Sequence, residues 1–142
     1  MSEASRPEAT IVLDAALAVV SAARARAAEL GLSVAIAVVD RAGAPVATAR
    51  MDGASLMAPE LAAAKAWTAA AFLAPSEDLT ETTKPEGEHW GFANTLAGRL
   101  CLLPGGVPIL DGEEPIGAVG VSGGPVAEDR ACAEAGAAAV AA

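Results

Sequence analysis

A glycine-rich stretch near the C-terminal end, LPGGVPILDGEEPIGAVGVSGG at residues 103–124, constrains the fold more than any other part of the chain. Two apolar runs within it, Val107–Asp111 and Pro115–Ser122, predict β-strands, and the Asp111-Gly112 pair between them predicts a tight turn. Seven of the 14 glycines of the chain fall in this window. Because glycine in a strand marks a close approach of another backbone, a helix end or a ligand, the stretch predicts a hairpin packed at short range.

The rest of the chain predicts further helices and strands around this hairpin. We expect helices at Glu8–Leu30, from Ser55 or Ala58 to Leu73, at Ser76–Thr82 and at Val126–Ala141, a turn at Trp90–Leu96, and strands at Leu32–Val39, Val46–Met51 and Arg99–Leu103. Two groups of strands with helices between them predict an α/β (α+β) fold, an antiparallel sheet of about five strands flanked by helices. We expect residues 1–7 to be a disordered tail and residues 8–142 to be a single domain.

The net charge and the distribution of apolar residues disfavour several classes of function. The formal net charge of −9 argues against a nucleic-acid partner, which needs a basic face, and against an anionic membrane surface. The N-terminus lacks the pattern of a signal peptide, and no run has the ~18 apolar residues of a membrane helix, so we expect a cytoplasmic protein. Cys101 and Cys132 are expected to be reduced and buried. Alanine-rich helices leave small-residue surfaces that predict a closed homo-oligomer.

Several short motifs follow one another along most of the chain. They are Val38-Val39-Asp40 with Gly43, Met51-Asp52-Gly53-Ala54, Ala64-Lys65 with Thr68-Ala69, Pro104–Ile109, and Ile116–Gly124 with Asp129. Because these motifs occur in this order, the chain resembles the GlcG/HbpS family. The family comprises haem-binding-protein-like domains that also form the C-terminal part of some corrinoid adenosyltransferases. The resemblance implies a profilin-like domain that assembles into symmetric oligomers. It also implies a link to haem binding or degradation in some members, and to glycolate or diol metabolism in others.

The resemblance leaves the haem ligand of this chain open. Family members that hold haem use histidine ligands, and one subgroup places its histidine on the first helix, where this chain has none. The only histidine is His89, so each subunit can supply one axial histidine at most.

The irregular segment at residues 76–99 holds His89 next to candidate partners. His89 could bind a metal or haem iron, or transfer a proton near neutral pH. Trp90 and Phe92 could line a site for a flat ligand, and Glu88 could orient His89 or act as a base. The plainer alternative is an exposed loop histidine beside solvated glutamates. We expect one pocket, walled by the second helix and residues 84–96 and closed by the start of the last helix.

Two cations are further candidates. Lys65 lies among alanines on the second expected helix, and its ammonium group either reaches solvent or points into a cleft to bind a carboxylate. Arg50 lies on a strand face that either faces water or lines a pocket. The turn at Ser122, Gly123 and Gly124 precedes the last helix, whose free N–H groups could bind a propionate or a substrate carboxylate. Its alternative role is simply to cap that helix.

Two functions from different classes follow. The first is a small-molecule-binding protein of the GlcG/HbpS type, for haem or another flat carboxylate-bearing ligand, with His89 as the metal ligand if haem is bound. The alternative is a cofactor-independent enzyme, an isomerase, lyase or cyclase acting on a small organic molecule. In that case Lys65, Arg50, Glu88 and His89 would supply proton transfer and anion binding. A scaffold without a ligand is the third reading.

Overall fold

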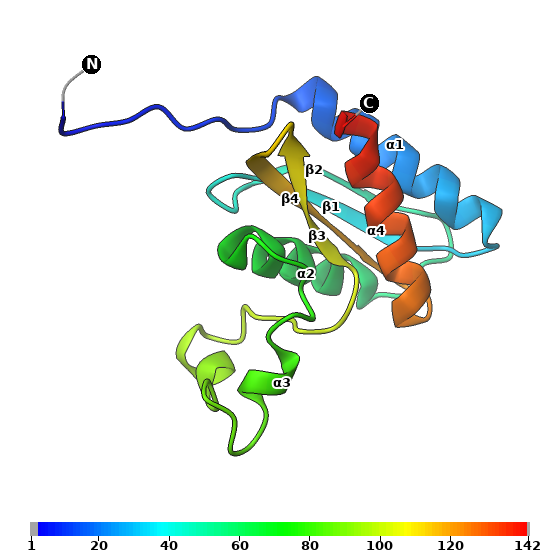
Figure 1. Cartoon of the computed structure of the whole chain (residues 1–142). Coiled ribbons are helices and arrows are strands. Elements are labelled where there is room, and N and C mark those ends of the chain that lie inside the picture. The colour runs from blue at the N-terminus through cyan, green and yellow to red at the C-terminus, as the bar shows by residue number, and fades with distance from the viewer. Residues whose placement is uncertain (1–2, 142) are drawn as a thin grey trace.

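An antiparallel sheet with helices on both faces forms the centre of the computed structural model, which describes residues 3–141 (Figure 1). In chain order the elements are α1 (Leu13–Glu29), β1 (Ala35–Asp40), β2 (Pro45–Arg50), α2 (Ala58–Phe72), α3 (Thr80–Thr83), a 3-10 helix (Phe92–Thr95), β3 (Gly106–Asp111), β4 (Glu114–Ser122) and α4 (Val126–Ala141). The four strands lie in the order β2-β1-β4-β3, with every neighbouring pair antiparallel. The α/β fold expected from the sequence is therefore confirmed. No helix within residues 3–141 is long and apolar enough to cross a membrane.

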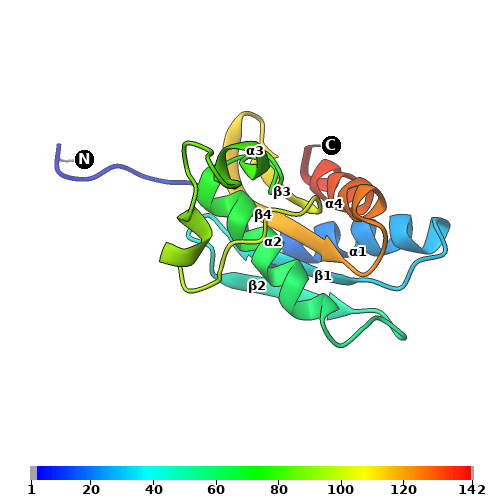
Figure 2. The ribbon, with the colours of Figure 1, turned by 90° about the horizontal axis from the view of Figure 1, so that it is seen from below.

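Helices α1 and α4 pack side by side on one face of the sheet, and α2 covers the other face (Figure 2). Strand β1 is buried on both faces, and its alternating side chains divide between the two layers. Ile36 and Val38 join the branched residues beneath α1 and α4, whereas Ala35 and Ala37 meet the alanines of α2. Most residues of the first core are Val and Ile, with alanines and Cys132 contributed mainly by the helices, and the second core consists almost entirely of alanine.

The alanine layer lets α2 lie directly on the backbone of the sheet. A Cβ atom at Gly120 on β4 would lie 2.0 Å from the carbonyl oxygen of Ala62, and one at Gly106 on β3 would lie 2.2 Å from that of Lys65. Real Cβ contacts are never this short, so only glycine fits at these two positions. Gly106 and Gly120 of the C-terminal hairpin are therefore required by a close helix–sheet approach of the kind that the sequence predicts.

The first helix begins later than expected, at Leu13 instead of Glu8. The residues before it are held extended, because the Ile11 amide donates to the carbonyl oxygen of Ile116 at 2.9 Å. The Glu8 carboxylate pairs with the Arg41 guanidinium at 3.1 Å. These long-range contacts replace the first helical turns that local periodicity predicts. Residues 1–2 of the expected tail lie outside the described residues, and disorder of residues 1–7 stays a prediction.

The strand expected at residues 99–103 does not form, so within the described residues the sheet has four strands. Side-chain hydroxyl groups form hydrogen bonds with the backbone groups that would otherwise pair with a neighbouring strand. The Cys101 amide donates to the Thr68 hydroxyl at 2.9 Å, and the Thr80 hydroxyl donates to the Leu102 carbonyl at 3.1 Å. The apolar residues of this segment therefore lie along α2 and α3 instead of extending the sheet.

The short helix expected at Ser76–Thr82 is displaced to Thr80–Thr83, and Ser76 does not cap it. The buried Ser76 hydroxyl instead donates to the Leu103 carbonyl at 2.6 Å and accepts from the Gly106 amide at 3.0 Å. Ser76 therefore connects the two ends of the irregular segment, the point where the segment leaves the domain and the point where it returns.

The close approach of α2 predicts a specific cost for enlarging Gly120. We expect Gly120→Val to lower the free energy of unfolding by about 1–3 kcal/mol, because the new side chain must push the helix off the sheet. Chemical unfolding measures this value, with Thr48→Val on the exposed side of β2 as the control, which should stay within about 0.5 kcal/mol of the wild type. An unchanged stability for Gly120→Val would mean that α2 does not lie on β4 at this distance.

Candidate functional site

Lys65 lies in the interior, where its ammonium group forms a buried ion pair. Its side chain is 1% exposed, and its Nζ lies 3.1 Å from Oδ2 of Asp129 and donates to the carbonyl oxygen of Val121 at 3.0 Å. The pair joins α2, the end of β4 and the first turn of α4. Neither alternative for Lys65 is found: its ammonium group reaches neither solvent nor a cleft, and the carboxylate that it binds is the buried Asp129 of this chain. A ligand would reach Lys65 only by displacing Asp129.

The turn at residues 122–124 also binds the carboxylate of Asp129 and not an external anion. The Gly124 amide, which could bind an anion at the start of α4, donates to Oδ1 of Asp129 at 2.9 Å. Ser122 is buried, and Gly123 has a φ of +132°, which glycine adopts without strain. The turn therefore binds the side chain of Asp129, so its role as a site for an external anion stays a prediction that requires the ion pair to open.

Cys132 lies next to this ion pair. Burial and then the negative charge of Asp129 raise the pKa of the Cys132 thiol. Cys132 is fully buried, whereas Cys101 is partly exposed, and both are free thiols. Cys132 is therefore a neutral packing group at physiological pH.

His89 lies in an aromatic group beyond the C-terminal end of α2. Its ring centroid is 5.5 Å from that of Phe92, which in turn lies 5.8 Å from Phe72 of α2. The Nδ1 atom of His89 lies 3.1 Å from the Thr82 hydroxyl, and that hydroxyl donates to the Leu79 carbonyl at 3.2 Å. Thr82 therefore contacts the imidazole through Nδ1, and Nε2 is the ring nitrogen that Thr82 does not engage.

The neighbours of His89 do not surround it. Glu88 and Trp90 are both exposed, Trp90 to 68%. Within residues 3–141 no group of three or more His, Cys, Asp or Glu side chains is placed to hold a metal ion. Of the sequence candidates in this segment, His89 and Phe92 contact each other. A metal ion bound at His89 would need its further ligands from a cofactor.

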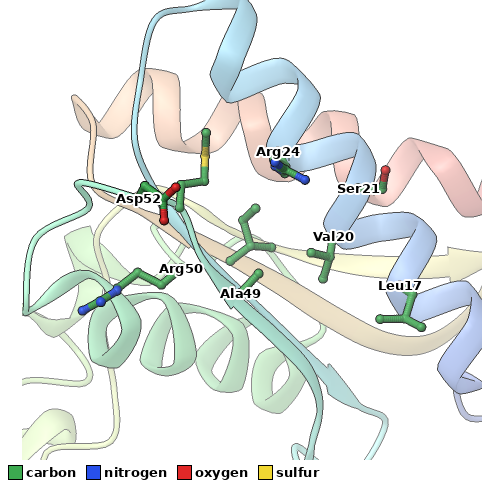
Figure 3. A pocket seen from close by; sticks show the side chains of 9 residues that line it. Leu17, Val20, Ser21, Arg24, Ala49, Arg50 and Asp52 are labelled. Carbon is green, nitrogen blue, oxygen red and sulfur yellow. The ribbon is translucent and has the colours of Figure 1, made fainter.

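Arg50 lies on the opposite side of the domain from His89, at the end of β2. It borders a hollow between α1 and β2, which Figure 3 shows from close by. Its side chain is exposed and extends to the α2 side of the sheet, because Ala49, the residue before it, faces α1. The structure therefore does not bring Arg50, Lys65 and His89 around one common cavity.

A second hollow, of about 270 Å³, lies between α2 and the turn that joins β1 to β2. Seven residues line this α2 hollow: Val39, Gly43, Pro45, Ala63, Ala64, Trp67 and Arg99. The Arg99 guanidinium lies over the Trp67 ring, 4.0 Å from its centroid. A guanidinium stacked on a ring keeps its N–H groups free at the edge, so the hollow joins an apolar wall to a cation that can bind a carboxylate.

The α2 hollow differs from the pocket that the sequence predicts. It shares α2 with that pocket, but neither residues 84–96 nor the start of α4 line it. Trp67 and Arg99 were not among the sequence candidates. The signal for Trp67 was a single large aromatic residue within a run of alanines, and a Cβ atom at Gly43 would lie 2.9 Å from its indole ring. Arg99 gave no signal, because its partner is 32 residues away.

Comparisons with known proteins agree with this fold. The family model described as haem degrading protein HbpS-like matches residues 11–138. A 15.0 kDa protein from the dhaT–dhaS intergenic region of Citrobacter freundii is 35% identical over 130 residues, which are 92% of each chain. The corrinoid adenosyltransferase PduO of the same organism is 36% identical over 119 residues. That match covers 84% of this chain but only 36% of PduO.

Solved structures show the same arrangement of the backbone. The protein ORFY of Klebsiella pneumoniae superposes with a TM-score of 0.95 at 32% identity, covering 100% of this chain and 97% of ORFY. A complex of PduOC with haem superposes with a TM-score of 0.86 at 32% identity, covering 92% of this chain and 94% of PduOC. Because the family model spans nearly all of the domain and the fold agrees throughout, the chain belongs to the HbpS-like family.

Proposed function

We propose that this protein binds haem or another flat molecule that carries carboxylates. The observation that carries the proposal is the α2 hollow, in which an apolar wall that includes Trp67 is bordered by the guanidinium of Arg99. A flat apolar ligand would lie against the wall, and its carboxylate would pair with Arg99. The superposition on a haem complex of PduOC supports haem as the first molecule to test.

His89 is our candidate for the axial ligand to haem iron; residues 84–96 do not line the α2 hollow, so a haem bound there would have to extend beyond it to reach His89. Thr82 holds the ring through Nδ1, which is the usual way that a second residue orients a ligating histidine, and Nε2 is the nitrogen that Thr82 does not engage. When bound, haem would supply the iron centre, and this chain supplies one histidine and a cation for a propionate. The segment that holds His89 lies on the side of α2 that faces away from the sheet (Figure 1).

The structure gives no support to the enzyme alternative. That reading needs Lys65, Arg50, Glu88 and His89 around one small molecule. Lys65 instead forms the buried pair with Asp129, Arg50 borders the hollow between α1 and β2, and His89 packs against Phe92 in the irregular segment. We therefore do not propose a cofactor-independent reaction.

Titration with haemin tests the proposal. We expect a saturable Soret band for the wild type, and His89→Ala should lose the band shift of axial ligation because the imidazole is gone. Arg99→Gln should weaken binding roughly tenfold to a hundredfold, since a hydrogen bond to a charged group contributes about 1.5–3 kcal/mol. The matched control is Arg26→Gln, which removes an exposed cation paired with Glu29 on the other face of the sheet.

Two results would contradict this account. No saturable Soret change with the wild type would rule out haem. Normal binding by both His89→Ala and Arg99→Gln would show that haem binds elsewhere on the protein.

We also propose a closed homo-oligomer. Large apolar side chains are exposed around α2, among them Leu56 at 87%, Met57 at 67% and Trp90 at 68%. Exposed groups of this size are typical of surfaces that pack against another subunit. A haem is wider than the α2 hollow, so a neighbouring subunit would cover the remainder of the ligand. Light scattering at micromolar concentration should give a dimer or a larger closed assembly, and a monomer would exclude this arrangement.

A further inference from the structure

A groove of about 460 Å³ lies between α1 and the edge strand β2, on the opposite face of the sheet from the α2 hollow. We call it the α1–β2 groove; its lining residues are Leu17, Val20, Ser21, Arg24, Ile36, Ala49, Arg50, Met51 and Asp52. Figure 3 shows Leu17 and Val20 of α1 along one wall and Ala49 on the strand below. The floor is apolar, and the polar groups are confined to its borders.

The charges around the α1–β2 groove are unusual for this protein. Its nine Lys and Arg residues all lie within residues 3–141. Six of them form ion pairs within that described part of the chain, and Arg99 stacks on Trp67. The two that have neither kind of partner there are Arg24 and Arg50, and both border this groove. In a protein with 18 acidic residues, the two cations without such a partner in the described residues both border this groove, and Arg24 is the one that projects toward its floor.

Arg24 is the cation that faces the apolar floor. In Figure 3 it projects from α1 on the same side as Val20, whereas Arg50 extends away from it. Ser21 lies one turn before Arg24 on the same helix and adds a hydroxyl group to the border. A guanidinium presents a planar pair of N–H groups that matches a carboxylate, so an anion at Arg24 would place the rest of its molecule over the floor.

We infer that the α1–β2 groove binds a small monocarboxylate with an apolar body. The carboxylate would pair with Arg24, and the apolar body would lie over Ala49 and Ile36. The carboxylate of Asp52 borders the same groove, so a second negative charge on the ligand would be repelled there. The inference is independent of haem binding, because the two cavities lie on opposite faces of the sheet.

Hexanoate is a suitable probe, with 1-hexanol and adipate as matched comparisons. In ¹H–¹⁵N correlation spectra of the intact protein, we expect hexanoate to shift the amide signals of Ser21, Ala49 and Met51 saturably. Hexanol lacks the carboxylate, and adipate brings a second one toward Asp52, so both should bind at least about fivefold more weakly, given the strength of charge-assisted hydrogen bonds.

Variants identify the group that binds the anion. Arg24→Gln should weaken hexanoate binding by roughly tenfold or more, whereas Arg26→Gln, two residues further along α1 and paired with Glu29, should leave it unchanged. Ala49→Leu should abolish binding by filling the floor. All three variants should keep the haemin titration of the wild type, which separates this inference from the proposed function.

The inference would be overturned by equal binding of hexanoate and hexanol, by unchanged hexanoate binding in Arg24→Gln, or by shifts confined to amides outside the α1–β2 groove. A loss of haemin binding in Arg24→Gln together with loss of hexanoate would also overturn it, because the groove would then be part of the haem site. Dispersed amide spectra of each variant confirm that the fold is intact.

Discussion

The ion pair between Lys65 and Asp129 connects the two faces of the sheet. Lys65 extends from α2 on one face, Asp129 belongs to α4 on the other face, and both reach the end of β4 through Val121 and Gly124. Both side chains are almost completely buried, at 1% and 2% exposure. Removing one partner of such a pair costs about 3–5 kcal/mol, because the remaining charge is left without compensation in the interior. The relative placement of α2 and α4 therefore depends on this contact.

The ion pair and the close approach of α2 both restrict where a ligand can bind. Asp129 occupies the turn before α4, and α2 lies so close to the strands that glycine is required at two positions beneath it. Among the hollows that remain, one lies beside α2 near Trp67 and another lies between α1 and β2 near Arg24. Each of these cavities combines an apolar wall with a guanidinium, which is why both proposals concern ligands that carry a carboxylate.

The sequence predicts the elements of this fold better than it predicts the contacts between them. The last helix was expected at Val126–Ala141 and is found there, because its start is marked by Pro125 and acidic residues in the first turn. The strand expected at residues 99–103 was wrong, because the hydroxyl groups of Thr68 and Thr80 take its backbone hydrogen bonds. Local periodicity contains no information about partners that are 20 or 30 residues away.

The same limit applies to the sites. Lys65 was recognised as unusual among alanines, but its partner 64 residues away was not identified. Arg24 was not among the sequence candidates, because the periodicity of a helix does not show that an edge strand leaves a groove beside it. Composition and spacing indicate which residues are exceptional, and the packing of the sheet decides what they contact.

The most direct test of the central claim is to observe the ammonium protons of the lysines by ¹H–¹⁵N NMR. The chain has only two lysines, Lys65 in the buried pair and Lys84, which is 59% exposed and pairs with Glu81. Our account predicts a slowly exchanging ammonium signal for Lys65, lost or strongly shifted in Asp129→Asn, while the protons of Lys84 exchange rapidly with water. Equally rapid exchange at both lysines, or a Lys65 signal that Asp129→Asn leaves unchanged, would contradict the buried ion pair on which the fold is argued to depend.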